Sequence, residues 1–264
     1  MDNPSIRLNK FLAERIGVSR READELISGG RITIDGKPAT LGARIDKIAK
    51  VCYNGKTIPF ETDFLYLAMN KPVGYVCSRR AQGEAPTIYT LLPEKYHSLK
   101  TVGRLDKDSS GLILLTNDGD FAFQMTHPKF HKEKIYEVEL DRPLEPLHQQ
   151  MISDYGVMLD DGPSRFTVVS SATTALGHIA TPSTGDDSKG DPHGAYRRGG
   201  KESAGPVEQM ARTHLTVILS EGRNRQIRRT FAALGYRVTS LHRTTFGKYE
   251  LSGLEPGKYV IIKP

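Results

Sequence analysis

The sequence predicts an α+β protein in which a small N-terminal α+β domain precedes a larger one, built on a mainly antiparallel mixed sheet flanked by helices and loops. Three observations predict this class. The chain of 264 residues is longer than most single domains. Two helical patterns and a strand come first, whereas apolar strand-like runs alternate with helices after residue 64. The acidic segment Glu61-Thr62-Asp63 reads as a linker, so domains are expected at 1–60 and 64–264.

Helical spacing and turn residues predict the N-terminal elements. Apolar residues of 7–15 recur at helical spacing, which predicts a short amphipathic helix. Ser19-Arg20-Arg21-Glu22 has the form of a capping box, because the serine hydroxyl can accept from the Glu22 amide while the Glu22 carboxylate reaches back. A second helix is therefore expected to begin there. Residues 31–34 then alternate like a strand before the turn Asp35-Gly36.

The larger domain begins with an expected buried strand. The apolar run 64–69 is long enough for one, and Asn70-Lys71-Pro72-Val73-Gly74 breaks it. Further strands are predicted at 111–115, 135–140, 214–219 and 260–262. Helices are predicted at 121–125, 145–154 and 225–234.

Composition narrows the class of partner. Lys and Arg total 37 against 31 Asp and Glu, a formal charge of +6, and the arginines cluster, which points to a polyanionic partner. Charge alone leaves open whether the basicity only aids solubility. Cys52 and Cys77 lie far apart without paired histidines, so neither a disulfide framework nor a zinc site is indicated. The N-terminus lacks the apolar core of a signal peptide, and no run approaches the ~20 apolar residues of a membrane span. A soluble, cytoplasmic protein without membrane association is expected.

One stretch carries neither helical nor strand patterning. Between Ser170 and Arg212 the chain is dominated by Gly, Ser, Pro, Asp and Lys, a composition that cannot bury a core. Residues 171–212 are therefore predicted to be a flexible insertion within one domain. Tyr196-Arg197-Arg198 inside it could contact a polyanion, but a solvated loop is the better explanation of these residues.

Arg20 and Arg21 suggest a phosphate ligand. Both stand at the start of the second predicted helix, where the helix macrodipole disfavours cations unless an anion is bound. Two arginines alone fit a solvated basic face equally well. The whole segment 7–39, RLNKFLAERIGVSRREADELISGGRITIDGKPA, resembles the S4 RNA-binding domain. This resemblance implies that Arg20 and Arg21 contact RNA.

A polar loop beside an apolar strand carries Asp106 and Asp108. Catalytic carboxylates often occupy such loops, yet the spacing alone fits a turn whose aspartates satisfy backbone amides. The full segment GRLDKDSSGLILLTNDG, residues 103–119, resembles the catalytic loop of the RsuA-type ribosomal RNA pseudouridine synthases, and Asp106 stands at their essential aspartate. Three further segments resemble the same family in the same order. They are MNKPVGYVCS at 69–78, HKEKIYEVEL at 131–140 and EGRNRQIRRTFAALGY at 221–236.

The resemblance implies roles for the residues around the target uridine. Isomerisation breaks the bond between ribose C1′ and uracil N1 and joins C1′ to C5, so an ionised Asp106 is expected to act at C1′ or C2′. Tyr136 stands where the family stacks a tyrosine on the flipped base. Unaided, a strand tyrosine would be taken as structural. Arg104 would displace or replace the flipped base, or simply orient the loop.

Basic residues are expected to pair with Asp106 and to contact RNA. Arg223 matches the family's basic partner of the aspartate, so an Asp106–Arg223 ion pair is predicted, with a phosphate contact as the alternative. In the predicted helix 225–234, Ile227, Phe231 and Leu234 mark a core face and the arginines lie elsewhere. Phosphate contacts are therefore expected from Lys71, Arg225, Arg228 and Arg229. Leu251 or Leu254 could line the uracil pocket.

Other functions are less consistent with these residues. A non-catalytic RNA-binding protein would have no use for Asp106, Tyr136 and Arg223 together. A glycosidase-like hydrolase using Asp106 and Asp108 would leave the S4 segment superfluous. His127 and His131 lack a third metal ligand, and the chain lacks a Gly-Lys-Ser/Thr phosphate loop. We therefore expect a monomeric enzyme without metal or organic cofactor. Its expected substrate is ribosomal RNA, large-subunit (23S) rather than small-subunit (16S), with tRNA as a side substrate.

Overall fold

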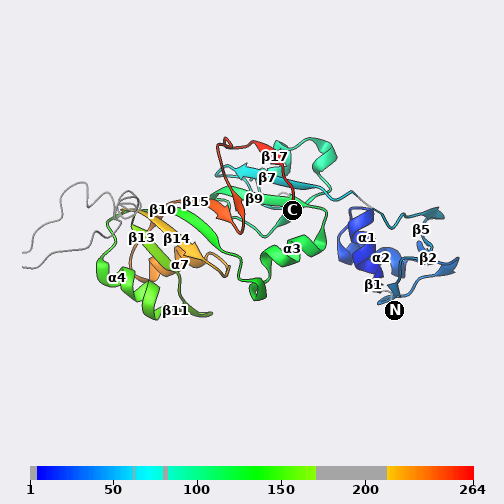
Figure 1. The fold of residues 1–264 in the computed structure, drawn as a ribbon, viewed down its shortest axis with the longest axis horizontal. Coiled ribbons are helices and arrows are strands. Elements are labelled where there is room, and N and C mark those ends of the chain that lie inside the picture. Colours follow the sequence, from blue (N-terminus) through cyan, green and yellow to red (C-terminus); the bar gives the residue numbers. More distant parts are fainter. Residues whose placement is uncertain (1–4, 62, 80–82, 171–212) are drawn as a thin grey trace, which may run out of the picture. The chain divides into compact units, whose positions relative to one another are not determined.

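The computed structural model describes residues 5–61, 63–79, 83–170 and 213–264 (Figure 1). The insertion predicted at 171–212 lies outside them, as does Tyr196-Arg197-Arg198 within it. The chain divides into two compact units, the first formed by Met1–Lys132 with Arg243–Pro264 and the second by Glu133–His242.

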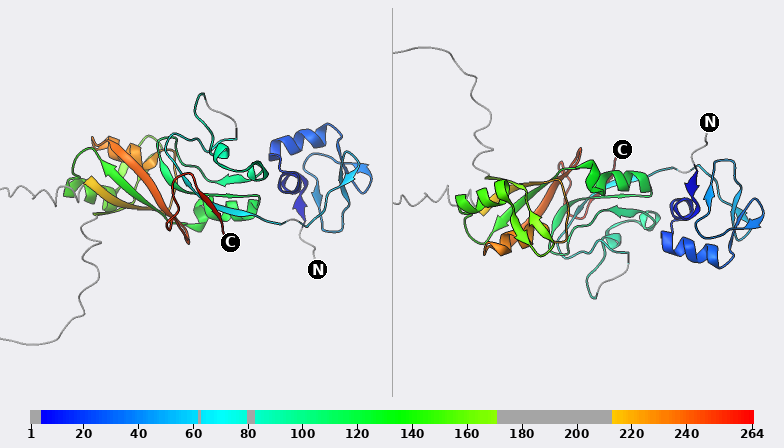
Figure 2. Two further views of the ribbon diagram at one scale, coloured as in Figure 1. Left: turned by 90° about the horizontal axis from the view of Figure 1, so that it is seen from above. Right: turned by 90° about the horizontal axis from the view of Figure 1, so that it is seen from below.

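The N-terminal part of the first unit holds two helices and two small sheets. Its elements are β1 (Ile6–Arg7), α1 (Leu8–Arg15), α2 (Arg20–Ser28), β2 (Ile32–Ile34), β3 (Lys37–Pro38), β4 (Arg44–Ile45), β5 (Val51–Tyr53) and β6 (Lys56–Thr57). Strand β1 pairs with β4, and the others form an antiparallel sheet in the order β3-β2-β5-β6. Helices α1 and α2 lie together on one side of this sheet (Figures 1 and 2).

Capping and apolar burial explain this part. The predicted capping box at α2 is confirmed: the Ser19 amide donates to Glu22 Oε2 at 2.7 Å, and the Glu22 amide donates to Ser19 Oγ at 3.1 Å. Positive φ at Asp35 and Asn54, each followed by a positive-φ glycine, closes the β2–β3 and β5–β6 hairpins. The apolar faces meet in one core. It contains Leu8, Phe11, Leu12, Ala23, Ile27, Ile32, Ala39, Ile45, Val51 and Ile58.

The rest of the first unit is a sheet with strand order β15-β9-β7-β17. Its elements are β7 (Tyr66–Lys71), β8 (Lys100–Val102), β9 (Ser110–Thr116), α3 (Gly119–Thr126), the end of β15 (Val238–Phe246), β16 (Tyr249–Glu250) and β17 (Tyr259–Ile261). Short 3-10 turns cover Ile88–Leu91, Glu94–Tyr96 and Pro128–Phe130. All six residues of β7 are buried, and β7 pairs antiparallel with β9 from Tyr66–Thr116 to Lys71–Gly111. The predicted strands at 64–69, 111–115 and 260–262 are thus present, with small shifts of their ends.

The second unit is an antiparallel sheet ordered β13-β14-β10-β15. Its elements are β10 (Lys134–Leu140), α4 (Pro146–Gln150), β11 (Val157–Leu159), β12 (Gly162–Ser164), β13 (Thr167–Ser170), β14 (His214–Leu219), α7 (Gln226–Ala233) and the start of β15. The helix predicted at 145–154 is present in two parts, because α4 continues as a π-helical turn at Met151–Tyr155 that ends at Gly156, whose φ is 81°. Within the described ranges, no helix is long and apolar enough to cross a membrane.

Candidate active site

Asp106 lies in the loop that joins β8 to β9 in the first unit. The two strands are hydrogen-bonded neighbours, with Val102 opposite Leu114. Residues 103–109 form the short connection between them. Within it the Ser109 amide donates to the Asp106 carbonyl at 3.1 Å. The Asp106 side chain is half-buried, whereas Arg104 and Asp108 are exposed. The Asp106 carboxylate therefore lies on a loop whose two ends are held by paired strands, of which β9 is buried over most of its length.

The segment 71–77 binds this loop at three points. The bonds are Leu105 N to Cys77 Sγ at 3.5 Å, Gly74 N to the Lys107 carbonyl at 2.7 Å, and Lys71 Nζ to the Ser109 carbonyl at 2.6 Å. They fall one residue before Asp106, one after it and three after it. The segment 71–77 therefore fixes the backbone on either side of the Asp106 carboxylate. Its sequence alone does not predict that it binds this loop.

Lys71 is a buried cation and not a surface contact. Its side chain is fully buried, and its ammonium group donates to the carbonyls of Ser109 and Pro72, at 2.6 and 3.0 Å. Burial lowers the pKa of Lys71, while the charges of Cys77, Asp106 and Asp108 oppose that change. Because the Lys71 side chain has no exposed surface in this structure, the predicted contact with RNA would require it to leave these carbonyls, and that contact stays a prediction. Lys71 lies 38 residues from Ser109 in the sequence, so the hydrogen bond between them could not be predicted from a local pattern.

Gly111 and Arg243 make a second close contact beside the loop. A Cβ on Gly111, whose φ is +104°, would lie 2.2 Å from the Arg243 carbonyl oxygen, so only glycine fits. Arg243 is 2% exposed, and its Nε donates to the Leu112 carbonyl at 2.8 Å. Sequence reasoning missed Arg243. The available signal was its place two residues after the buried Leu241 on an alternating strand.

Tyr136, the residue predicted to stack on the base, lies on β10 in the second unit. It lies opposite Val217 of β14, and its parity matches the buried Val138 and Leu140 of its own strand. Only 8% of the residue is exposed, so little of the ring can move without disturbing the sheet. A rigid aromatic ring of this kind is suited to hold a planar base by stacking.

Arg223 is bound by the turn between β11 and β12. Its Nη1 donates to Asp161 Oδ1 at 2.9 Å and to the carbonyls of Asp161 and Gly162 at 3.1 Å, and its Nη2 donates to the Pro163 carbonyl at 2.8 Å. Its Nε lies 3.6 Å from a Glu221 carboxylate oxygen. The guanidinium group of the residue predicted to pair with Asp106 thus has a carboxylate partner, Asp161, in its own unit.

Arg229 shares that partner. Its Nη2 binds Asp160 and also lies 2.7 Å from Asp161 Oδ1, while its Nη1 donates to Asp161 Oδ2 at 3.0 Å. The hydrogen bond from Arg229 lowers the pKa of Asp161, and the same bond raises the pKa of Arg229. A phosphate would have to compete with the carboxylates of Asp160 and Asp161 for the Arg229 guanidinium group. The predicted contact between Arg229 and RNA therefore requires at least one of these ion pairs to break.

Buried polar groups fix the start of α7. Gln226 and Thr230 are fully or almost fully buried, and both bond the buried Ser164 hydroxyl of β12, at 3.1 and 2.7 Å. Ile227 and Phe231 fill the apolar face, as predicted, and Leu234 is half-buried. The arginines of this helix are therefore presented from a rigid base.

The other predicted RNA contacts differ in exposure. Arg225 is exposed and caps α7 in the left-handed region at φ 47°. Arg228 is half-buried, and its Nη1 donates to the Val238 carbonyl at 2.8 Å. Arg20 and Arg21 are exposed at the start of α2, where Arg20 Nη2 donates to Asn9 Oδ1 at 3.2 Å.

Comparisons with known proteins agree with this architecture. A family model described as RNA pseudouridylate synthase matches residues 65–233, and an S4 domain model matches residues 6–47. The chain is 34% identical to a protein of Pasteurella multocida named ribosomal small subunit pseudouridine synthase A, over 96% of this chain and 94% of that one. Proteins of the same name from Yersinia pestis and Escherichia coli K12 are 33% and 31% identical, over 96% of this chain and 93% and 95% of theirs.

A solved structure and the names of these relatives complete the comparison. A crystal structure of a pseudouridylate synthase superposes with a TM-score of 0.60 at 28% identity, covering 98% of this chain and 96% of that one. The relatives are named for the small ribosomal subunit, so they do not support the expected preference for 23S RNA. Family models, relatives and fold agree on one assignment: the chain belongs to the RsuA-type pseudouridine synthases, with an N-terminal S4 domain.

Proposed function

We propose that this enzyme converts one uridine of small-subunit (16S) ribosomal RNA to pseudouridine, in the cytoplasm, where ribosomal RNA is found. The names of the relatives support the choice of subunit. The observation that carries the choice of Asp106 is its loop, which the segment 71–77 binds at three backbone positions. A carboxylate that must act on one ribose carbon needs such a fixed position.

Asp106 supplies the reactive carboxylate in this proposal. The bond between C1′ and N1 breaks, uracil turns, C5 joins C1′, the proton on C5 leaves and N1 gains a proton, so substrate and product have the same atoms. Asp106 assists either as a nucleophile at C1′ or as a base at C2′. Both uses require the ionised form. Metal ions and organic cofactors have no part in these steps.

Tyr136 holds the uracil ring while it is detached. Stacking on a side chain that the sheet keeps rigid allows the base to turn in its own plane while its face stays covered. Arg104, exposed two residues before Asp106, takes the place that the flipped nucleotide leaves. The S4 domain and the exposed Arg21 and Arg225 bind the RNA backbone.

Arg223 is retained as the proposed partner of Asp106, with a condition. Its guanidinium group now bonds Asp161 and three backbone carbonyls in its own unit. Pairing with Asp106 in the complex with RNA requires Arg223 to release at least the Asp161 carboxylate. Arg229, which already binds Asp161, would keep that carboxylate satisfied.

Mapping pseudouridine in ribosomal RNA tests the function. The gene is deleted, and both ribosomal RNAs are mapped with and without a plasmid that encodes the wild type or Asp106→Asn. We expect one small-subunit site to disappear and to return only with the wild type. Loss of a large-subunit site instead would overturn the choice of subunit, and an unchanged map would overturn the activity on ribosomal RNA.

A further inference from the structure

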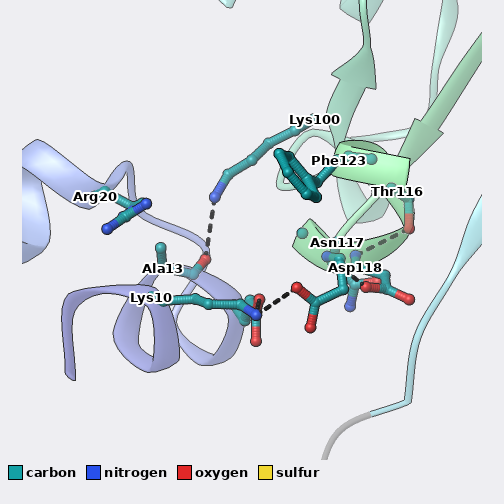
Figure 3. Close-up of a pocket in the computed structure, with 12 residues that line it drawn as sticks. Lys10, Ala13, Arg20, Lys100, Thr116, Asn117, Asp118 and Phe123 are labelled. Atoms are coloured by element: carbon teal, nitrogen blue, oxygen red, sulfur yellow. Dashed lines mark hydrogen bonds and ion pairs between the residues drawn. The ribbon is translucent and has the colours of Figure 1, made fainter. Parts of the chain in front are cut away.

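A pocket in the first unit lies between α1 and α3, apart from the Asp106 loop. Its volume is about 360 Å³, within the range of small-molecule sites. Residues of α1, α2, β8, β9 and α3 line it, and none of them belongs to the loop 103–109. Figure 3 shows the side chains of Lys10, Lys100 and Phe123 extending into this space, with Arg20 at its edge.

Three carboxylates line the pocket, Glu14, Asp118 and Asp120, and each contacts other groups of the protein. Glu14 lies 3.9 Å from Lys10 Nζ and 3.9 Å from Arg15 Nη1. Asp118 caps α3 by accepting from the amides of Asp120 and Phe121, and its second oxygen accepts from the Tyr66 hydroxyl at 2.8 Å. Asp120 Oδ1 lies 2.5 Å from Lys10 Nζ. These two carboxylates therefore repel an anionic ligand less than their number suggests.

Two cations of the pocket are bound to neutral groups instead. Lys100 Nζ donates to the carbonyls of Ala13 and Val18, at 3.3 and 3.1 Å, and burial lowers the pKa of Lys100. Arg20 Nη2 donates to the Asn9 amide oxygen. Across the described ranges, neither side chain has a carboxylate within ion-pair distance. The charges of Glu14 and Glu22 act on Lys100 only from beyond ion-pair distance, so both cations can still attract an anion.

The aromatic side of the pocket is the exposed ring of Phe123. This residue is 45% exposed and belongs to a cluster with Phe130, whose ring is perpendicular at 5.8 Å, and His127 at 4.7 Å. Lys129 Nζ lies 5.1 Å from the Phe123 centroid and 4.7 Å from that of Phe130. Exposed aromatic rings beside cations are the combination that binds single-stranded nucleic acid.

We propose that this pocket binds an unpaired nucleotide of the substrate RNA, with its base stacked on Phe123 and its phosphates beside Arg20 and Lys100. The proposal rests on the proposed function, because it assumes an RNA substrate. The nucleotide is a second one, distinct from the target uridine, since the pocket contains no residue of the Asp106 loop. Recognition of a second nucleotide would help to select one uridine among many.

The test measures binding in an enzyme that does not turn over. Full-length Asp106→Asn is titrated with a labelled transcript of small-subunit ribosomal RNA, alone and combined with Phe123→Ala, Phe123→Leu or Phe123→Tyr. Loss of one stacked base weakens binding by at least about fivefold. We expect that loss for alanine and leucine, which lack a π face, and not for tyrosine. Phe64→Ala is the matched control, because Phe64 is 41% exposed in the same unit.

Ultraviolet crosslinking locates the contact directly. We expect a crosslink between the transcript and the peptide that contains Phe123, and none when uridine monophosphate replaces the transcript. Arg20→Gln should reduce the dependence of log Kd on log salt by about one phosphate contact. Unchanged affinity in Phe123→Ala, an equal loss in Phe64→Ala, or an equal crosslink to uridine monophosphate would each overturn the proposal.

The two proposals fail in different ways. Pseudouridine formation by the wild type on the same transcript reports on the proposed function, whereas these titrations use a variant that needs no activity. An active wild type with unchanged Phe123 variants would reject the pocket alone.

Discussion

The ammonium group of Lys71 lies 2.6 Å from the carbonyl oxygen of Ser109, three residues after Asp106. A fully buried cation thus binds the C-terminal end of the loop that carries the proposed catalytic carboxylate. A second bond, to the Pro72 carbonyl, joins the cation to the turn that follows β7. Lys71 therefore connects the end of one buried strand to the start of the next.

Replacing Lys71 should reduce turnover more than RNA binding. Lys71→Met removes the ammonium group that donates to the carbonyls of Pro72 and Ser109. Loss of a hydrogen bond to a buried polar group costs about 1–3 kcal/mol. We expect lower stability in urea and a fall in kcat, with the Kd for RNA nearly unchanged. Lys56→Met, at an exposed position of β6, is the control. A rise in Kd without a fall in kcat would show that Lys71 contacts RNA after all.

Asp106 and Asp108 form a matched pair for testing the chemistry. Both carboxylates lie in one loop, and Asp108 is the more exposed. Asp106→Asn should lower kcat by at least about a hundredfold, as loss of a catalytic acid–base or nucleophilic group does. Asp108→Asn should stay within a few-fold of the wild type. Single-turnover release of tritium from 5-tritiated uridine in the transcript measures both, and similar rates for the two variants would remove Asp106 from its role.

The ring of Tyr136 should matter more than its hydroxyl if it stacks on uracil. Tyr136→Phe keeps the ring at a position that is 8% exposed, whereas Tyr136→Leu removes it. We expect phenylalanine to retain more of kcat/KM than leucine does. Thermal melting of both variants controls for the fold. Equal losses with unchanged melting would show that the hydroxyl group, and not stacking, is needed.

Variants of Arg223 and Asp161 should show whether Arg223 acts in catalysis or only stabilises the fold. If Arg223 leaves Asp161 for Asp106, Arg223→Gln should lower kcat strongly and Asp161→Asn only slightly. If Arg223 mainly holds the β11–β12 turn, both variants should lose activity and stability together, because both break the bond that is 2.9 Å long here. Paired measurements of kcat and of urea unfolding decide between the two.

Glu14 should make stability depend on pH. Its side chain is 9% exposed, and burial raises the pKa of Glu14 above 4.5 despite the charge of Lys10. The native state then holds the proton more tightly than the unfolded state, so this residue lowers stability as pH rises through the raised pKa. Glu14→Gln has no group that ionises here, so its free energy of unfolding does not fall in this way. The stability of Glu14→Gln relative to the wild type should therefore increase as pH rises through the raised pKa of Glu14. A difference that is constant with pH would contradict this, and Glu25→Gln, at an exposed position, is the control.

Local chemistry made much of the fold predictable. The capping box at Ser19 and Glu22 and the turn at Asp35-Gly36 follow from interactions between neighbours in sequence, and both are present. The π-helical turn at Met151–Tyr155 was not predicted, because its spacing differs from that of an α-helix by only one residue.

The sequence by itself determined the capped helices, the buried strands, the S4 segment and the loop that carries Asp106. These depend on apolar periodicity, turn residues and motifs that are contiguous in the chain. Only the tertiary structure decided that Lys71 is buried under Ser109, that Gly111 must be glycine against Arg243, and that Arg223 binds Asp161. Each of these contacts joins residues 38 to 132 positions apart, and no local pattern encodes which distant carbonyl or carboxylate a long cationic side chain meets.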